Sequence, residues 1–173
     1  MIYNMTKSII LVVLNSGEAI MKISYKSDYA LKALLELALR YEQDKARIVP
    51  IAEIAKFGDM PKKFLEQILL ALVRGGFVKS KRGSGGGFIL AKQPSEITIG
   101  DVLRFVEGPI GPIACVNDSY KDCRDVKGCV FRSVWKEVAG AISIVIDTLT
   151  FEKLILRYKG KEPSTSSNYE YII

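Results

Sequence analysis

Residues 51–90 of this 173-residue chain read IAEIAKFGDMPKKFLEQILLALVRGGFVKSKRGSGGGFIL, and this stretch decides the fold. Apolar residues recur there at spacings of three and four, which predicts two amphipathic helices, over 51–56 and 61–74. Gly58-Asp59 marks a turn between them, and Gly75-Gly76 ends the second helix. The pattern is typical of a helix–turn–helix.

Two short strands follow the second helix, over 77–79 and 88–90, around a basic glycine-rich turn. Two strands joined by such a turn, directly after a helix–turn–helix, indicate a wing. The glycine run also invites comparison with a phosphate-binding loop. It lacks the Gly-Lys-Ser or Gly-Lys-Thr ending and precedes a strand rather than a helix, so a nucleotide site is excluded.

Positive charge is concentrated in this segment. Residues 56–82 hold seven basic and two acidic residues, a net +5 out of +6 for the whole chain. Clustered Lys and Arg supply most of the non-specific affinity for DNA. The residues expected at DNA lie at the start of the second helix, which meets base edges, and in the wing, whose tip can enter the minor groove: Lys62, Lys63 and Gln67, then Lys81, Arg82 and Ser84.

A less specific interpretation of each feature is available. The lysines can be an ordinary solvated helix face, and the glycine run an ordinary hairpin loop. Each feature alone favours that interpretation. Both occur here in sequence order with the charge concentrated on them, so we expect a DNA-binding domain.

The flanking regions predict a mainly α fold. Helices are expected over 24–41, 98–107 and 133–156, and the last carries a 3-4 apolar seam typical of a helix pair. We expect a weakly ordered extension over 1–20, a winged helix–turn–helix domain over 21–97, a short helix and cysteine loop over 98–132, a dimerisation helix over 133–157, and a flexible tail over 158–173. The seam residues are Trp135, Val138, Ile142, Val145 and Leu149.

Composition restricts the chemistry. The chain contains no histidine, which excludes His-based acid–base catalysis, Ser-His and Cys-His nucleophile pairs, and imidazole metal ligands. An enzyme is therefore not expected. No apolar run reaches the length of a membrane span, so no membrane partner is expected. An odd number of cysteines without a secretion signal points to the reducing cytoplasm.

The three cysteines follow the pattern Cys115-x7-Cys123-x5-Cys129 in a segment without periodicity. A flexible loop allows three thiolates to converge on one metal centre. Structural zinc usually has four ligands with close cysteine pairs, whereas three thiolates without imidazole suit an iron–sulfur cluster with one weak or borrowed ligand. A thiol switch without metal and three inert buried cysteines remain open alternatives.

Taken together, the chain resembles the IscR/NsrR/CymR-type winged-helix regulators of the Rrf2 family, over about residues 21–155. A leading helix, a Leu-Glu-Gln helix, a glycine-rich wing and a three-cysteine loop occur together and in order. The segments that carry the resemblance are SDYALKALL (27–35), IAEIA (51–55), FLEQI (64–68), LVRGGFV (72–78) and RGSGGGF (82–88).

The resemblance implies a homodimer with crossed C-terminal helices that binds palindromic double-stranded DNA. It places Lys63, Glu66 and Gln67 near bases and makes Arg82 the minor-groove arginine of the wing. Glu66 then tunes base choice by accepting from cytosine N4. It also implies a cluster, of the 2Fe–2S or 4Fe–4S type, on the three cysteines.

Two departures from the family pattern affect the cluster. The first cysteine spacing is seven residues where five is usual, and Arg132 stands where the IscR type has its ligand histidine. The NsrR type instead borrows an aspartate from the first helix of the partner subunit, and Asp28 occupies that position. Asp28 can equally be a first-turn acid paired with Lys32.

The predicted function is therefore a dimeric regulator, a repressor among the possibilities, that senses redox state, nitric oxide or iron–sulfur status through the cluster. The cluster is expected to order the loop and set the angle between the dimer helix and the DNA-binding unit. The alternative is a DNA-binding repressor with unmetallated cysteines that senses through a thiol switch or a partner protein.

Overall fold

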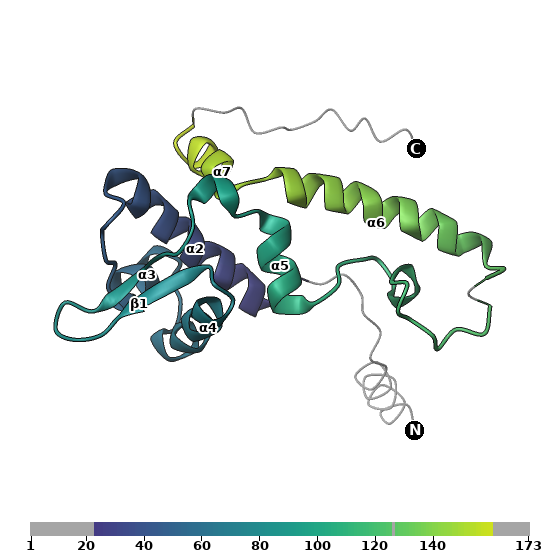
Figure 1. Ribbon diagram of the computed structural model, residues 1–173, viewed down its shortest axis with the longest axis horizontal. Coiled ribbons are helices and arrows are strands. Elements are labelled where there is room, and N and C mark those ends of the chain that lie inside the picture. Colours follow the sequence, from purple (N-terminus) through teal and green to yellow (C-terminus); the bar gives the residue numbers. More distant parts are fainter. Residues whose placement is uncertain (1–22, 126, 161–173) are drawn as a thin grey trace, which may run out of the picture. The chain divides into compact units, whose positions relative to one another are not determined.

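The computed structural model describes residues 23–125 and 127–160 (Figure 1). The expected extension over 1–20 lies outside the described residues, as does nearly all of the expected tail. The described part is mainly α-helical with a two-stranded antiparallel sheet, which confirms the predicted fold class. Its contacts separate two compact units: residues 23–108 with 143–160, and residues 109–142.

Helix α2 (Tyr25–Gln43) is the centre of the larger unit. It begins at the cap residue Ser24, whose hydroxyl accepts from the Ser27 amide at 3.3 Å. Its apolar side, with Leu34 and Leu37 fully buried, contacts α3, α4, α5, α7 and β2. This one helix therefore holds α3, α4, the second strand of the hairpin and α7 in a common core.

The helix–turn–helix consists of α3 (Ile51–Phe57) and α4 (Lys62–Arg74), as predicted. Asp59 in the turn has φ of 48°, a left-handed conformation that Asp tolerates better than most residues. Helix α4 buries one side of its surface and leaves the other to solvent. The buried residues are Leu65, Ile68, Leu69 and Leu72.

The wing is formed by β1 (Val78–Lys81) and β2 (Gly87–Leu90), paired from Val78 opposite Leu90 to Lys81 opposite Gly87. A bridge fastens it to the body. The Val49 amide donates to the Phe88 carbonyl at 2.8 Å, and the Phe88 amide donates to the Val49 carbonyl at 2.9 Å. The segment before α3 thus pairs with β2 through a single antiparallel bridge.

After the wing, a 3-10 turn, η1 (Pro94–Glu96), leads into α5 (Ile99–Glu107). The expected cap at Thr98 is present. Its hydroxyl accepts from the Asp101 amide at 3.0 Å, and the Asp101 carboxylate accepts from the Thr98 amide at 3.1 Å. This reciprocal pair fixes where α5 begins.

The C-terminal helix differs from the prediction. One helix was expected over 133–156, but α6 (Val130–Thr148) ends and α7 (Phe151–Tyr158) begins within that range. The intervening residues are extended, because the Ile99 amide donates to the Leu149 carbonyl at 2.9 Å and the Phe151 amide to the Ile97 carbonyl at 3.0 Å. Thr150 then caps α7, and Phe151 is fully buried in the core.

Candidate nucleic-acid interface and cysteine loop

The exposed side of α4 carries the residues that the sequence singled out. Pro61 caps the helix and, like every helix start, α4 has free amide groups in its first turn. Next to them lies a surface of basic, amide and carboxylate side chains. The basic and amide groups can donate to phosphate oxygens and base edges, and the carboxylate can accept from bases. Its members are Lys62, Lys63, Glu66 and Gln67, all of them solvent-exposed.

The wing presents the second exposed group, Lys81, Arg82 and Ser84. The turn between the strands is tight: the Gly86 amide donates to the Gly83 carbonyl at 2.9 Å, and Gly83 has φ of 106°. That φ is accessible to glycine and strained for other residues. The turn holds Arg82 beside the end of β1, where its guanidinium is free of the core.

All seven predicted DNA-contacting residues therefore lie exposed on two neighbouring elements of one unit. Sequence reasoning overlooked two further exposed residues of α4. Phe64 is 38% exposed and its ring packs edge-on against Tyr29, with centroids 5.7 Å apart. Leu70 is 56% exposed, one turn beyond Glu66 and Gln67. Phe64 belonged to the apolar helical pattern and Leu70 is an apolar residue beside it, so neither gave a signal that it reaches solvent.

The cysteine loop belongs to the smaller unit. Cys115 lies in a 3-10 turn, η2 (Ala114–Val116), and Cys129 directly precedes α6. All three thiols are free and half-buried. Among the described residues, no three Cys, His, Asp or Glu side chains gather closely enough to hold a metal ion. The donor chemistry suits an iron–sulfur cluster, but the loop would have to rearrange to bring the three sulfurs together.

Arg132 organises this loop from the first turn of α6. Its Nε donates to the Cys115 carbonyl oxygen at 2.8 Å, and its Nη2 pairs with Asp118 at 3.1 Å. The Lys136 ammonium also pairs with Asp118, at 2.7 Å. The hydrogen bond from Lys136 is the main reason that the pKa of Asp118 is lowered. Arg132 is thus a structural hydrogen-bond donor in this loop.

Asp28 lies in the first turn of α2 and pairs with Lys32 at 2.7 Å. This hydrogen bond is the main cause of the raised pKa of Lys32. Within the chain, Asp28 therefore forms the first-turn ion pair with Lys32 that the sequence offered as the alternative to metal ligation. Its neighbours Ser24 and Ser27 both donate to Glu107, a contact that sequence reasoning did not foresee.

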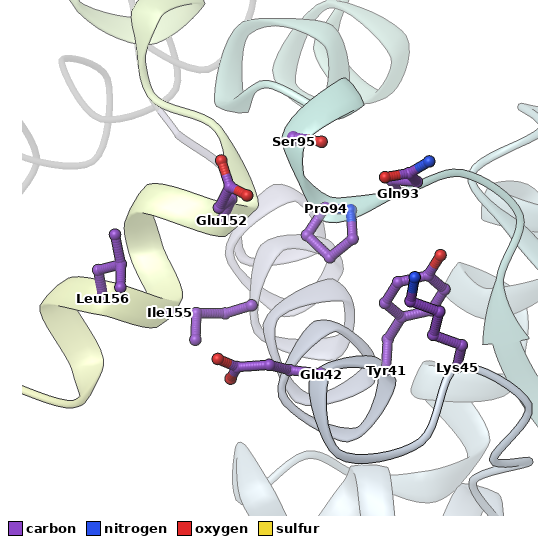
Figure 2. Close-up of a pocket in the computed structure, with 9 residues that line it drawn as sticks. All are labelled: Tyr41, Glu42, Lys45, Gln93, Pro94, Ser95, Glu152, Ile155 and Leu156. Carbon is purple, nitrogen blue, oxygen red and sulfur yellow. The ribbon is translucent and has the colours of Figure 1, made fainter.

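A cavity of about 390 Å³ lies at the other end of α2 (Figure 2). Such a volume is within the range of small-molecule sites. None of the sequence-predicted site residues belongs to it, and its polar groups are of mixed charge. The lining comes from the end of α2 and the loop after it, from η1 and its preceding residue, and from α7: Tyr41, Glu42, Lys45, Gln93, Pro94, Ser95, Glu152, Ile155 and Leu156.

Comparison with known proteins agrees with this geometry. The model of the Rrf2 family, described as an iron-dependent transcriptional regulator, matches residues 23–157. The chain is therefore a winged-helix transcriptional regulator and belongs to the Rrf2 family. None of the described helices is both long and apolar enough to cross a membrane.

Individual relatives cover most of the chain. An Rrf2-like HTH-type regulator of Rhodobacter capsulatus is 42% identical, over 77% of this chain and 91% of the relative. CymR of Bacillus subtilis is 32% identical, over 82% and 95% of the two chains. IscR of Serratia proteamaculans is 30% identical, over 78% and 79%.

Solved structures give the same result. The structure of CymR, the global cysteine regulator of B. subtilis, matches with a TM-score of 0.63 and 33% identity, over 78% of this chain and 96% of that one. IscR of T. potens matches with a TM-score of 0.64 and 30% identity, over 83% and 92%. The relatives thus include regulators of both the CymR and the IscR type.

Proposed function

We propose that this regulator binds palindromic double-stranded DNA as a homodimer and that the chemical state of Cys115, Cys123 and Cys129 sets its DNA affinity. The observation that carries the proposal is the joint exposure of the α4 and wing residues on one unit. Helix α4 is proposed to enter the major groove, where Lys63, Glu66 and Gln67 face bases. The wing is proposed to place Arg82 in the flanking minor groove.

Helix α6 is the proposed dimer element. None of its described residues is buried within the chain, although many are large and apolar. Trp135 and Val138 are each 37% exposed and Val145 is 53% exposed, and the three stand at the spacing of a helix-pair seam. An unpartnered apolar row of this length supports pairing with the same row of a second copy. Two copies would present two α4 helices to the two half-sites of a palindrome.

The cysteine loop is the proposed sensor, working in the reducing cytoplasm that the thiol content suggested. Cys115, Cys123 and Cys129, with Asp28 of the partner subunit, would hold an iron–sulfur cluster of the 2Fe–2S or 4Fe–4S type. When bound, the cluster would supply redox and nitric oxide chemistry and a fixed point for three thiolates. To bind the cluster, Asp28 would have to give up its ion pair with Lys32. Ligation would therefore depend on the conformation of the first turn of α2.

A thiol switch without metal is the second candidate, and one observation favours it. The described residues do not bring three donor side chains together, while the three thiols are free and half-buried. Half-buried thiols are accessible to oxidants and to other thiols. The relative described as a global cysteine regulator fits this candidate as well as the IscR relatives fit the cluster.

One experiment separates these candidates. The protein is isolated without oxygen, and its visible spectrum, iron and sulfide are measured together with its affinity for a duplex selected from a random pool. The cluster predicts a coloured protein that loses iron and changes DNA affinity about tenfold or more on Cys123→Ala. A colourless, iron-free protein whose affinity changes with thiol oxidation supports the switch. Equal affinity in every state would refute sensing through the cysteines.

A further inference from the structure

A single carboxylate joins the end of α5 to the start of α2. Glu107 is the last residue of α5, and its Oε1 accepts from three donors: the Ser24 amide at 3.1 Å, the Ser24 hydroxyl at 2.5 Å and the Ser27 hydroxyl at 2.5 Å. Ser27 is fully buried. A carboxylate at a helix start accepts hydrogen bonds from free amide groups, and its negative charge interacts favourably with the helix dipole.

The charge state of Glu107 fits this role. Burial acts to raise its pKa, but the hydrogen bonds from Ser24 and Ser27 act more strongly together, and the pKa lies below its ordinary value. Glu107 is therefore ionised at neutral pH, and its negative charge stays at the positive end of α2. The contact spans 80 residues of sequence between Ser27 and Glu107, so it is a tertiary link rather than a local cap.

The same turn of α2 contacts the DNA-facing helix. Tyr29, two residues after Ser27, packs edge-on against Phe64 with the ring planes at 75°. Phe64 is the third residue of α4 and lies between Lys63 and the fully buried Leu65. Edge-on aromatic pairs are favourable contacts, so displacement of one ring costs the packing of the other. A shift of the start of α2 therefore reaches the start of α4.

On its other side, Glu107 is connected to the cysteine loop. Gly108 follows it with φ of 87°. The smaller unit begins at the next residue, Pro109, which precedes Cys115 by six positions. We propose that Glu107 is a positioning residue that couples the end of α5, from which the cysteine loop departs, to the start of α4, through Ser24 and Ser27 and then the Tyr29–Phe64 contact. This coupling rests on the proposed function in one respect, namely that α4 binds DNA.

Hydrogen exchange on the full chain tests the coupling without DNA or metal. We expect Glu107→Gln to speed exchange about tenfold in two places, the amides of residues 27–31 in α2 and of residues 64–68 in α4. Ser27→Ala should give a weaker form of the same pattern and covers the case in which Glu107→Gln does not fold. Adding Phe64→Leu to either variant should uncouple α4 from the effect on α2.

Glu96→Gln is the matched control, because Glu96 also caps a short element, accepting from the Gln93 amide at 2.9 Å. Among the described residues, its hydrogen bonds do not reach α4. It should leave residues 64–68 unchanged. Faster exchange confined to residues 27–31 in the Glu107 and Ser27 variants would overturn the coupling and leave a local cap. A DNA-affinity measurement on the unaltered chain is made in parallel. Its failure would refute DNA binding, whereas the exchange pattern decides the coupling independently.

Discussion

Gly87 shows how closely the wing and the body approach each other at one residue. A Cβ at this position would lie 2.4 Å from the Val49 carbonyl oxygen and 2.7 Å from its carbon, both of them backbone atoms. The bridge between Val49 and Phe88 depends on this approach. Glycine is therefore needed at position 87 for close packing against the Val49 backbone, and not only for the flexibility of the turn.

We expect Gly87→Ala to lower the free energy of unfolding by about 1–3 kcal/mol, because the Val49 segment must move away from the wing. Urea denaturation followed by circular dichroism measures the change. Gly85→Ala is the control: nothing lies within 4 Å of its added Cβ and its φ is not positive, so its effect should stay within about 0.5 kcal/mol. Equal loss in both variants would contradict the close-approach explanation.

At this scale, sequence reasoning located exposed polar residues well but not their partners. Lys63 and Arg82 lie where a helical period and a turn signal put them, because both signals are local. The Glu107 contact with Ser24 and Ser27 joins residues about 80 positions apart, and no local pattern encodes it. The partners of Arg132 were missed for the same reason: Cys115 and Asp118 precede it by 17 and 14 residues.

Among the elements, the junction of α6 and α7 is the one that the sequence did not predict. Leu149, Phe151 and Ile155 continue the helical apolar spacing, so the pattern contains no stop signal. The break arises from the pairing of residues 149–151 with residues 97–99, again a long-range contact. The helix–turn–helix and the wing were predictable because their turns carry glycine and aspartate.

A bidentate ion pair holds the end of α6 against α5. Arg104 donates to the two carboxylate oxygens of Asp147 at 2.6 and 2.9 Å, and also to the Ser143 hydroxyl at 3.3 Å. Gly100 makes this approach possible, since a Cβ there would lie 1.8 Å from the Asp147 carboxylate. The C-terminal end of α6 is thus fastened to α5.

We expect Asp147→Asn to lower the free energy of unfolding by about 0.2–1 kcal/mol at pH 7, a modest amount because the Asp147 side chain is 43% exposed. The hydrogen bond from Arg104 lowers the pKa of Asp147, so the ionised pair contributes its full stability above the unfolded-state pKa. That stability is lost as the pH falls through the folded-state pKa. Thermal unfolding from pH 7 down to about 3 should show the two proteins converging below about pH 4.

The control for this pair is Glu137→Gln, an exposed acid elsewhere on α6. The difference in the free energy of unfolding between this variant and the unaltered chain should not shrink as the Arg104–Asp147 pair is lost at low pH. A difference for Asp147→Asn that persists unchanged at pH 3 would contradict an ionic contribution.

For the whole molecule, the exposed row on α6 makes the proposed dimer testable. We expect the double variant Val138→Glu with Val145→Glu to sediment as a monomer, because four like charges would face one another along the seam of a dimer. Its affinity for a palindromic duplex should fall about tenfold or more, since one half-site no longer assists the other. Sedimentation and fluorescence anisotropy measure the two effects.

Glu137→Ala is the matched control on the same helix and should remain dimeric. A double variant that is still dimeric would place the interface elsewhere. A chain that is monomeric before any substitution would refute the dimer proposal itself.

The pairing of residues 149–151 with residues 97–99 has a consequence for the segment that carries the cysteines. Because α5 on one side and the end of α6 on the other are both fastened to the DNA-binding unit, the segment 109–142 is an insertion between two fixed anchor points. Its length can change without moving either anchor, which explains how the seven-residue interval between Cys115 and Cys123 is accommodated. The segment 109–142 is in this sense a cassette, whose length and chemistry can change while the winged-helix unit stays the same.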